Sequence, residues 1–470
     1  MSNVILSTDS YKLTHWKQYP PNTNRVYSYM EAREGGRYPY TVFFGLQAII
    51  KEHLEGRVVT WDGLEEAVDI AAKHLGVGSF NYKGWAKIID KHKGKLPVEI
   101  RAVLEGTPVP LGNVMMTIEN TDPEFPWLTN ALESILMHVW YPSTVATLSR
   151  HTKQVIEKYL DKTAMSTAGL PFMLHDFGFR GASSEETAAI GGAAHLLNFQ
   201  GTDTLPAIVE AKRYYGADLS TLAFSVPATE HSVMTARGVT GEYLVLDQLL
   251  ASYPEGILSV VADSYDIYQF VKNVAGPYRD QIKERDGKFV VRPDSITQQH
   301  PTPESLVVWI LETLWRGFSG TVNVKGNKIL DSHVGVLWGD GLEPDEIERI
   351  LAAMELHGFS AENIVFGMGG GLLQKVNRDT QRFAIKASAI EIDGKWTEIR
   401  KDPRDSTKKS KAGKLALVYF DDKVQTVPYT GDGMGVIDGH YCDDMLQTVF
   451  KDGEIVVDQT FEEIRKRAAL

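Results

Sequence analysis

Between about residues 170 and 370, short apolar runs alternate with amphipathic segments of helix length, and this rhythm constrains the fold most. The apolar runs are continuous rather than alternating with polar residues, as expected of strands buried on both faces of a parallel sheet. A series of such β-α units predicts a (β/α) barrel or a doubly wound sheet, and the near-regular spacing favours the barrel. The seven runs span residues 172–177, 195–199, 222–226, 257–263, 289–294, 334–340 and 363–367.

Helix signals lie between these runs. The segment 183–195 opens with serines and glutamates, and the segment 343–358 opens with Glu-Pro and further acids and closes with glycine. Both patterns are typical of helix starts, and a closing glycine is typical of a helix end. They support a β/α interpretation of this part of the chain.

The two ends of the chain have a different pattern. Residues 25–33 and 114–120 read as strands and residues 128–160 as one long helix, whereas residues 383–392, 414–420 and 454–461 read as antiparallel strands before a last helix. We therefore predict an α/β protein with two domains. The predicted domains are an irregular β/α barrel over 146–379 and a discontinuous α+β domain built from 1–145 and 380–470.

Composition narrows the class of protein. The chain has 470 residues, and its 49 Lys and Arg against 61 Asp and Glu give a net charge of −12, so a nucleic-acid partner is not expected. The single cysteine, Cys442, allows no intramolecular disulfide and fits a reducing cytoplasm. We see neither a signal peptide nor an apolar run of about 18 residues, so we expect a cytoplasmic protein that does not enter a membrane.

Polar or small residues follow every apolar run. In a barrel these positions converge at the C-terminal face of the sheet, where such folds keep their sites. Two arginines and a glycine-rich turn suit phosphate groups. Several aspartates suit ribose hydroxyls, a magnesium ion or an amide donor. The residues are Asp176, Arg180, Gly201, Asp203, Glu230, His231, Asp263, Asp266, Arg292, Asp294, Gly339, Asp340, Gly367, Gly369, Gly370 and Gly371.

Simpler interpretations exist for each of them. An aspartate after a strand is often the N-cap of the next helix, and glycine often only ends a strand. His231 in "SVPATEHSV" could be a polar turn residue, and the basic run 400–414 could be a solvated loop. A metal-dependent barrel hydrolase would need more histidines at the strand ends. A non-catalytic nucleotide-binding protein would have no need for exposed aromatic rings such as Phe177 and Tyr11.

Motifs along nearly the whole chain resemble those of the nicotinamide phosphoribosyltransferases, a type II phosphoribosyltransferase family of NAD salvage. They include "TDSYKLTHWKQYPPNTNRVYSYMEAR", "LHDFGFRG", "FQGTDT", "SVPATEHS", "RPDS" and "FGMGGGLLQKVNRD". The resemblance implies an irregular β/α barrel beside a second α+β domain, and a head-to-tail homodimer with sites at its interface. It also implies transfer of phosphoribose from phosphoribosyl pyrophosphate to nicotinamide, with Mg²⁺ as cofactor and ATP as coupled co-substrate; nicotinate is the alternative acceptor.

The resemblance also assigns residues. Phe177 and Tyr11 of the partner subunit sandwich the nicotinamide ring, and Asp203 accepts a hydrogen bond from its carboxamide. Arg180, His231 and Arg292 meet the pyrophosphate. A further set holds the ribose phosphate or a nucleotide tail: Asp294, Gly339, Asp340, Gly369, Gly370, Arg378, Arg33, Lys386, Lys401 and Lys409. No residue is assigned as a direct magnesium ligand, because the diphosphate is expected to hold the ion.

The ring nitrogen of nicotinamide is neutral and needs no base, so His231 is not needed as a general base. The resemblance implies another role, in which His231 is phosphorylated by ATP, and Glu230 or Asp263 is expected to orient its ring. A carboxylate at Asp203 would repel nicotinate and so favours nicotinamide. Two departures from the family pattern stand out, since Ile296-Thr297-Gln298 replaces Gly-Asn-Pro and Phe179 replaces a tyrosine.

Overall fold

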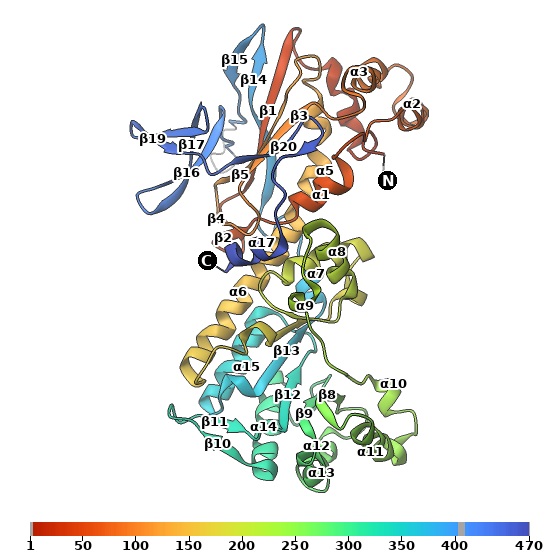
Figure 1. Cartoon of the computed structure of the whole chain (residues 1–470), viewed down its shortest axis with the longest axis vertical. Coiled ribbons are helices and arrows are strands. Elements are labelled where there is room, and N and C mark those ends of the chain that lie inside the picture. The colour runs from red at the N-terminus through yellow and green to blue at the C-terminus, as the bar shows by residue number, and fades with distance from the viewer. Residues whose placement is uncertain (1–2, 403–408, 470) are drawn as a thin grey trace. The chain divides into compact units, whose positions relative to one another are not determined.

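The computed structural model describes residues 3–402 and 409–469, and they form two compact units. Unit 1 comprises Met1–Thr147, Ala211–Ala217 and Asn377–Leu470. Unit 2 comprises Leu148–Glu210 and Asp218–Val376. Figure 1 shows the elements of both units.

Unit 2 is built on a parallel sheet of six strands in the order β7-β6-β13-β12-β9-β8 (Figure 1). Valine, isoleucine and phenylalanine of the inner strands are almost fully buried, which is why the strands read as continuous apolar runs. Five of the seven predicted strands overlap one of these strands. The bounds are β6 (Leu174–Asp176), β7 (Gly201–Thr202), β8 (Glu255–Val261), β9 (Asp286–Arg292), β12 (Val334–Trp338) and β13 (Ile364–Met368).

The two edges of this sheet meet through one segment of irregular chain, residues 224–228. Phe224 makes a parallel bridge to Gly201 at one edge, and Ala228 makes one to Ser259 at the other. Pro227 between them has no backbone N–H to donate, so a regular strand cannot form. The predicted strand at 222–226 is thus wrong in detail, although the segment occupies the place that a seventh strand would fill in a barrel.

The prediction of a strand at 195–199 is wrong. His195 is the last residue of α7 (Glu185–His195), and the strand follows only at β7. Helix α7 consists largely of alanine and glycine and is buried on most sides, so its apolar end has the same appearance as a short buried strand. Gly192 shows how close the packing is, because a Cβ there would lie 2.5 Å from Cβ of Ala207.

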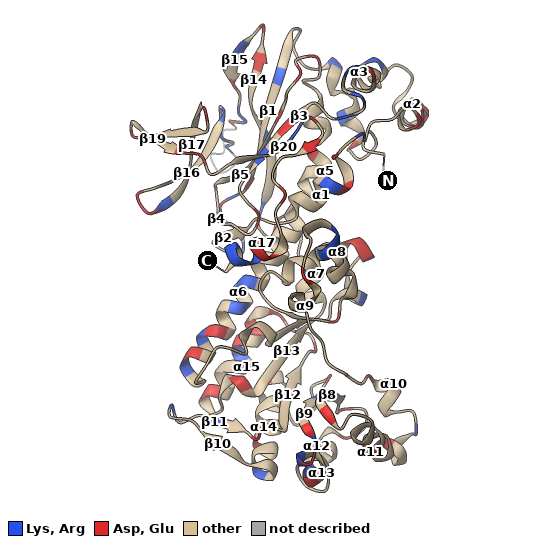
Figure 2. Ribbon diagram, viewed as in Figure 1, with Lys and Arg blue, Asp and Glu red and all other residues tan. Residues whose placement is uncertain are grey.

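The helices of unit 2 begin where the sequence signals predict. Ser184 caps α7 by accepting from the backbone N–H of Thr187, and Glu343 and Glu346 form a capping box at α15. On the surface, Lys158 and Lys162 of α6 pair with acids of α15, and Figure 2 shows both charge signs along these two helices. The bounds are α6 (Trp140–Thr163, shared with unit 1), α8 (Leu205–Tyr215), α9 (Leu219–Leu222), α10 (His231–Met234), α11 (Glu242–Ser252), α12 (Ile267–Ala275), α13 (Arg279–Lys283), α14 (Pro303–Phe318), α15 (Pro344–Leu356) and α16 (Gly370–Leu373).

Unit 1 is built on an antiparallel sheet in the order β15-β14-β1-β5-β3-β20-β21, with a separate four-stranded sheet β16-β17-β18-β19. The antiparallel pairing of 383–392 with 23–32 confirms that both chain ends contribute to one sheet. The main bounds are β1 (Thr23–Ala32), β3 (Val98–Ala102), β5 (Val114–Asn120), β14 (Phe383–Ile392), β15 (Lys395–Glu398), β16 (Leu415–Phe420), β17 (Lys423–Gly431), β18 (Met434–Ile437), β19 (His440–Asp443), β20 (Gln447–Lys451) and β21 (Glu454–Ile455).

Two predictions for unit 1 need correction. The single helix predicted over 128–160 is three helices, α4 (Leu128–Ala131), α5 (Glu133–Met137) and α6, because the chain turns at Leu132 and again at His138 and Val139. The strand predicted over 454–461 is only the two residues of β21. The remaining helices are α1 (Leu46–His53), α2 (Trp61–Leu75), α3 (Tyr82–His92) and α17 (Phe461–Ala468).

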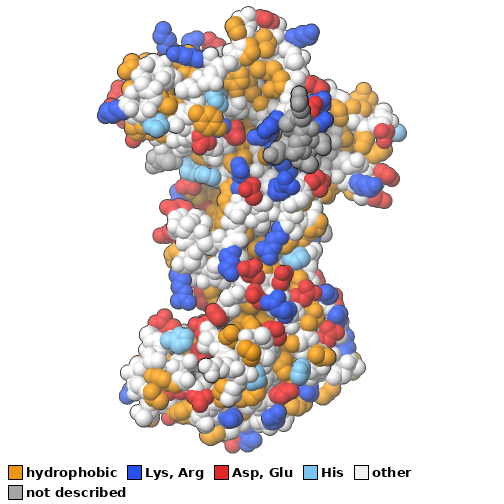
Figure 3. Space-filling model, turned by 180° about the vertical axis from the view of Figure 1, so that it is seen from behind, with side chains coloured by type: hydrophobic (Ala, Val, Ile, Leu, Met, Phe, Trp, Pro, Cys, Tyr) orange, Lys and Arg blue, Asp and Glu red, His pale blue; other side chains and the backbone are white. Residues whose placement is uncertain are grey.

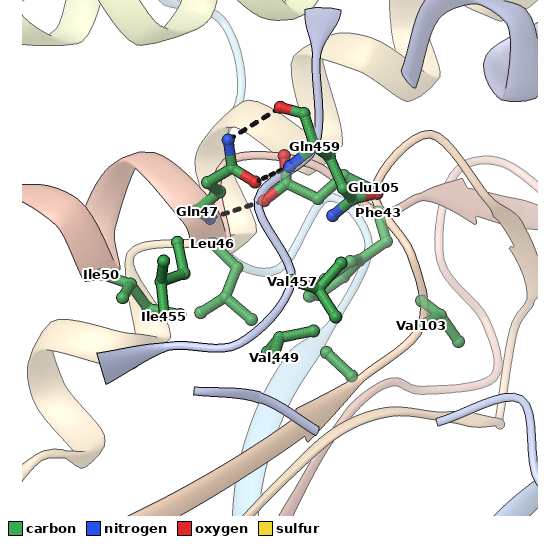
Figure 4. A pocket seen from close by; sticks show the side chains of 11 residues that line it. Phe43, Leu46, Gln47, Ile50, Val103, Glu105, Val449, Ile455, Val457 and Gln459 are labelled. Carbon is green, nitrogen blue, oxygen red and sulfur yellow. Dashed lines mark hydrogen bonds between the residues drawn. The ribbon is translucent and has the colours of Figure 1, made fainter. Parts of the chain in front are cut away.

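A buried polar network stabilises the core of unit 1 (Figure 4). The Glu105 carboxylate accepts from the backbone N–H of Gln47 (2.6 Å) and of Gly45 (3.1 Å) and from the Tyr215 hydroxyl (3.0 Å). The Gln47 side chain in turn exchanges two hydrogen bonds with the backbone of Gln459. Burial raises the pKa of Glu105, because the charged carboxylate loses its contact with water. The three donors oppose this effect and so stabilise the carboxylate in the core.

The surface carries charges of both signs. Figure 3 shows acidic and basic side chains interspersed on the face that is turned away in Figure 1. None of the helices in the described part of the chain combines the length and apolar character that a bilayer crossing requires.

The buried His195 predicts a pH dependence of stability. Its Nδ1 lies 3.0 Å from the Ser149 hydroxyl and its Nε2 lies 3.2 Å from the carbonyl oxygen of Gly201, so the ring is neutral and donates through Nε2. Burial lowers the pKa of His195 from 6.5 to about 3. The unfolded chain therefore binds one more proton below pH 6.5, and folding stability falls as the pH falls toward 3.

We expect the unfolding free energy of the wild type to fall between pH 6 and 5 by ~1.4 kcal/mol more than that of His195→Gln, which cannot titrate. Urea unfolding at both pH values measures the difference between the two proteins. Equal slopes would show that this ring does not gain a proton on unfolding.

Candidate functional site

An open pocket lies at the C-terminal ends of the parallel strands of unit 2. Its volume of about 690 Å³ is large enough for a ligand of nucleotide size. Both arginines that follow the strands line it, together with three acids and glycines after β12 and β13. The lining residues are Phe177, Phe179, Arg180, Gly181, Asp203, Thr204, Ala228, Thr229, Glu230, His231, Ser232, Arg292, Asp294, Gly339, Gly369 and Gly370.

The Phe177 ring packs on glycine backbone at one wall of the pocket. A Cβ added to Gly367 of β13 would approach the ring at 2.1 Å, and one added to Gly339 after β12 would lie 3.5 Å away. These two glycines therefore create the space that the ring occupies. The backbone N–H of Phe177 donates to the carbonyl of Met368 at 3.0 Å, which fixes the turn that carries the ring.

His231 is the first residue of α10 and lies between two carboxylates. Its Nε2 is 3.2 Å from Asp263 Oδ1, and its Nδ1 is 4.0 Å from Asp294 Oδ2. The Asp263 side chain is 8% exposed and that of His231 is 47% exposed, so a buried acid supports a ring that solvent and a ligand can reach. The other oxygen of Asp263 accepts from the hydroxyl of Ser295.

Arg292 at the end of β9 is held by the backbone next to His231. Its Nη2 donates to the carbonyl of Thr229 at 2.9 Å, and the Thr229 hydroxyl accepts from the N–H of Val261. Burial and the negative charges of Asp294 and Asp263 raise the pKa of Asp340, so these three acids lie close to one another. Guanidinium donors beside clustered acids suit a ligand that brings negative charge and a cation together.

Asp203 follows β7 on the opposite side of the pocket. Its carboxylate accepts from the hydroxyl of Ser225, and its backbone N–H donates to the carbonyl of Asp176 at 2.9 Å. The Asp176 side chain is buried and accepts from the N–H of Gly178 at 2.7 Å. Burial raises the pKa of Asp176 to about 6, and the charge of Asp203 adds to this rise.

The carboxylates do not form a metal site by themselves. Within residues 3–402 and 409–469, no three His, Cys, Asp or Glu side chains come together in a way that could hold a metal ion.

The other predicted site residues lie in unit 1. The Tyr11 side chain is 57% exposed, and its ring makes an edge contact with that of His15 at 5.2 Å. Burial lowers the pKa of Lys386; the acid Glu133 opposes this, and the positive charges of Arg33, Lys12 and Arg378 add to it. These basic side chains therefore form a cationic cluster on unit 1, suited to an anion.

Lys401 and Lys409 flank the undescribed residues 403–408 of the basic loop, so the middle of that loop lies outside the described residues. Lys409 pairs with Asp402 at 3.1 Å, and the backbone of Lys401 exchanges hydrogen bonds with Ser410. Both lysines thus lie on the surface of unit 1.

Sequence patterns identified most of the pocket but not all of it. Ten of the predicted residues line it, Asp263 and Asp340 adjoin them through the contacts of His231 and Asp294, and six others lie in unit 1. Ser225, Thr229 and Ser295 were not predicted. Each hydroxyl contacts a strand-end group, yet a lone serine or threonine in a loop carries no pattern that would reveal this.

Comparison with known proteins identifies the family. The model of the nicotinate phosphoribosyltransferase (NAPRTase) family matches residues 172–454, which is more than half of the chain. The chain belongs to this family. A second model, the N-terminal domain of nicotinamide phosphoribosyltransferase, matches residues 3–100, and the two together confirm the resemblance inferred from the motifs.

Two bacterial relatives extend over the full chain. A protein named nicotinamide phosphoribosyltransferase from Xanthomonas campestris is 43% identical, with 100% of this chain and 98% of the relative covered. A second one of that name from Acinetobacter baylyi is 33% identical, with 99% and 97% covered.

Two solved structures confirm the fold class. Nicotinate-nucleotide pyrophosphorylase from Pyrococcus furiosus superposes with a TM-score of 0.62 at 15% identity, over 99% of this chain and 95% of its own. Human nicotinic acid phosphoribosyltransferase gives a TM-score of 0.60 at 15% identity, over 98% and 93%. At these identities the likeness concerns the fold alone.

The packing of Phe177 on Gly367 predicts a specific loss of stability. Gly367→Ala places a methyl group inside the volume of the ring, and overpacking of this kind costs ~1–3 kcal/mol. We expect the melting temperature to fall by roughly 3–9 °C. Gly169→Ala is the control, because Gly169 has φ of −78° and nothing within 4 Å of an added Cβ.

The cause can be checked in the same measurement. Phe177→Ala removes the ring that collides, so Gly367→Ala should add little further destabilisation in that background. If Gly367→Ala lowered the melting temperature equally with and without the Phe177 ring, the methyl group would be straining the strand instead.

Proposed function

We propose that the protein transfers the phosphoribosyl group of phosphoribosyl pyrophosphate to nicotinamide, giving nicotinamide mononucleotide and pyrophosphate. The proposal rests on one observation. The same pocket contains the Phe177 ring, which packs on glycine backbone, the Asp203 carboxylate and two arginines, Arg180 and Arg292. The names of the full-length relatives support the same reaction.

In this proposal Phe177 stacks on the pyridine ring and Asp203 accepts from the carboxamide N–H₂. A carboxylate at this place repels the negative charge of nicotinate, so it favours nicotinamide as the acceptor. A head-to-tail homodimer would supply Tyr11 of the partner subunit as the second face of the sandwich. The exposure of Tyr11 on unit 1 supports this role, because a ring that is 57% exposed can stack on a ligand.

Arg180 and Arg292 would stabilise the departing pyrophosphate, which carries the charge that develops as the anomeric C–O bond breaks. Asp294, Gly339, Asp340, Gly369 and Gly370 would hold the ribose and its phosphate. The cationic cluster of unit 1, with Arg33, Arg378 and Lys386, and the nearby Lys401 and Lys409 would meet phosphate or nucleotide groups brought by the substrates. We propose that magnesium is held mainly by the diphosphate, since the described acids do not form a site alone.

His231 needs a role other than general base, because the attacking ring nitrogen carries no proton. We propose that it accepts a phosphoryl group from ATP. Asp263, at 3.2 Å from Nε2, would hold the ring with Nδ1 toward the pocket and stabilise its positive charge, with Glu230 as a neighbour at the N-cap of α10. The location would be the cytoplasm, where these substrates occur.

A pyrophosphate-release assay tests the reaction. Nicotinamide, nicotinate and quinolinate are offered in parallel with phosphoribosyl pyrophosphate and magnesium, with and without ATP. We expect nicotinamide to be the best acceptor and ATP to increase the rate. A preference for nicotinate would favour the alternative, a nicotinate phosphoribosyltransferase, and no release with any acceptor would contradict both.

Replacing the Asp203 carboxylate should change the choice of acceptor. In Asp203→Ser the hydroxyl neither repels nicotinate nor accepts as strongly from the carboxamide, so we expect the ratio of kcat/KM for nicotinate to that for nicotinamide to rise by at least tenfold, or ~1.4 kcal/mol. Measuring both kcat/KM values in the variant and the wild type gives the ratio. An unchanged ratio would remove Asp203 from acceptor recognition.

Removing the imidazole of His231 should separate ATP hydrolysis from phosphoribosyl transfer. His231→Ala is expected to abolish ATP hydrolysis while a slow transferase activity remains, because Phe177, Asp203 and the arginines are untouched. Phosphate release from ATP and nicotinamide mononucleotide formation are measured in the same preparation. ATP hydrolysis at the wild-type rate would exclude a phosphorylated His231.

A further inference from the structure

The hydroxyl of Ser225 donates to Asp203 Oδ1. Within the described part of the chain this is the hydrogen bond that the Asp203 carboxylate accepts. Both residues are exposed and Asp203 lines the pocket, so the contact is not a by-product of core packing. It leaves Oδ2 available to a ligand.

The backbone around Asp203 is fixed independently of Ser225. The Asp203 N–H donates to the carbonyl of Asp176 at 2.9 Å, and the Thr204 N–H donates to the hydroxyl of Thr202 at 3.0 Å. Thr204 then accepts from the N–H of Ala207 as α8 begins. The main chain at Asp203 is therefore anchored on both sides, whereas its side-chain torsions depend on the single contact with Ser225.

The irregular segment that joins the sheet edges explains how Ser225 reaches this place. Phe224 exchanges two backbone hydrogen bonds with β7, from its own N–H to Gln200 and from the N–H of Thr202 to its carbonyl. This register places the next residue, Ser225, directly beside Asp203. Two residues later Pro227 ends the pairing, so the Ser225 side chain is not enclosed in a regular sheet.

We propose that Ser225 is a positioning residue for the acceptor: it holds the Asp203 carboxylate in the rotamer in which Oδ2 meets the carboxamide N–H₂ of nicotinamide. The proposal rests on the proposed function of this pocket and extends it to a residue that does not itself touch the acceptor.

Loss of the Ser225 hydroxyl should therefore weaken the binding of nicotinamide and leave the turnover rate unchanged. Without the hydroxyl, Asp203 samples other rotamers, and the acceptor must select the competent one at a cost in affinity. The pyrophosphate groups remain untouched, so the bound complex reacts as before. The negative charge also remains, so nicotinate is still rejected.

The test uses steady-state kinetics on the full-length protein with nicotinamide as the varied substrate. We expect Ser225→Ala to raise KM for nicotinamide about tenfold, as loss of one hydrogen bond to a charged group allows, with kcat within about twofold. Ser225→Thr keeps the hydroxyl and should restore KM. Ser252→Ala is the matched control, because Ser252 is exposed at the end of α11, outside the pocket.

A double-mutant cycle distinguishes positioning from a general effect on the loop. In the Asp203→Ala background, Ser225→Ala should change KM by less than about twofold, because no carboxylate is left to position. An equal rise in KM in that background, an unchanged KM in Ser225→Ala alone, or no rescue by threonine would overturn the proposal. Absence of nicotinamide turnover by the wild type would instead overturn the proposed function, so the two failures are distinct.

Discussion

The pocket depends on how the two edges of the parallel sheet of unit 2 are joined. Phe224 bridges β7 and Ala228 bridges β8, so the chain between them completes the ring of strand ends without forming a strand. A regular strand there would direct alternate side chains away from the pocket. Because Pro227 interrupts the pairing, Ser225, Thr229, Glu230 and His231 emerge at the C-terminal face, where the other strand ends already converge.

The sequence predicted the inner strands because their burial on both faces removes all polar alternation. β9, β12 and β13 lie where continuous apolar runs predicted them. The same signal failed for α7, since a helix made of alanine and glycine and buried on most sides also lacks a polar face. It failed in a second way at 222–226, where one proline changed a strand into two isolated bridges.

The site residues also fall into two groups, those that the sequence predicts and those that it does not. Charged residues at strand ends could be predicted as a group, because the C-terminal ends of parallel strands converge on one face of the sheet. The hydroxyls of Ser225, Thr229 and Ser295 could not, because their partners come from other strands and depend on the register of the closed sheet. Gly367 was noted as part of a glycine-rich turn, yet its use, to seat the Phe177 ring, required the packing of β13.

One buried acid connects the two halves of the acceptor side of the pocket. Asp176 accepts from Gly178 through its side chain and from Asp203 through its carbonyl, so the turn that carries Phe177 and the loop that carries Asp203 share one anchor. Burial raises the pKa of this carboxyl to about 6, which means that its charged form is costly there. The distance between ring and carboxylate is thus set by the sheet itself. In the proposed function, what remains adjustable for the choice of acceptor is the side-chain torsions of Phe177 and Asp203.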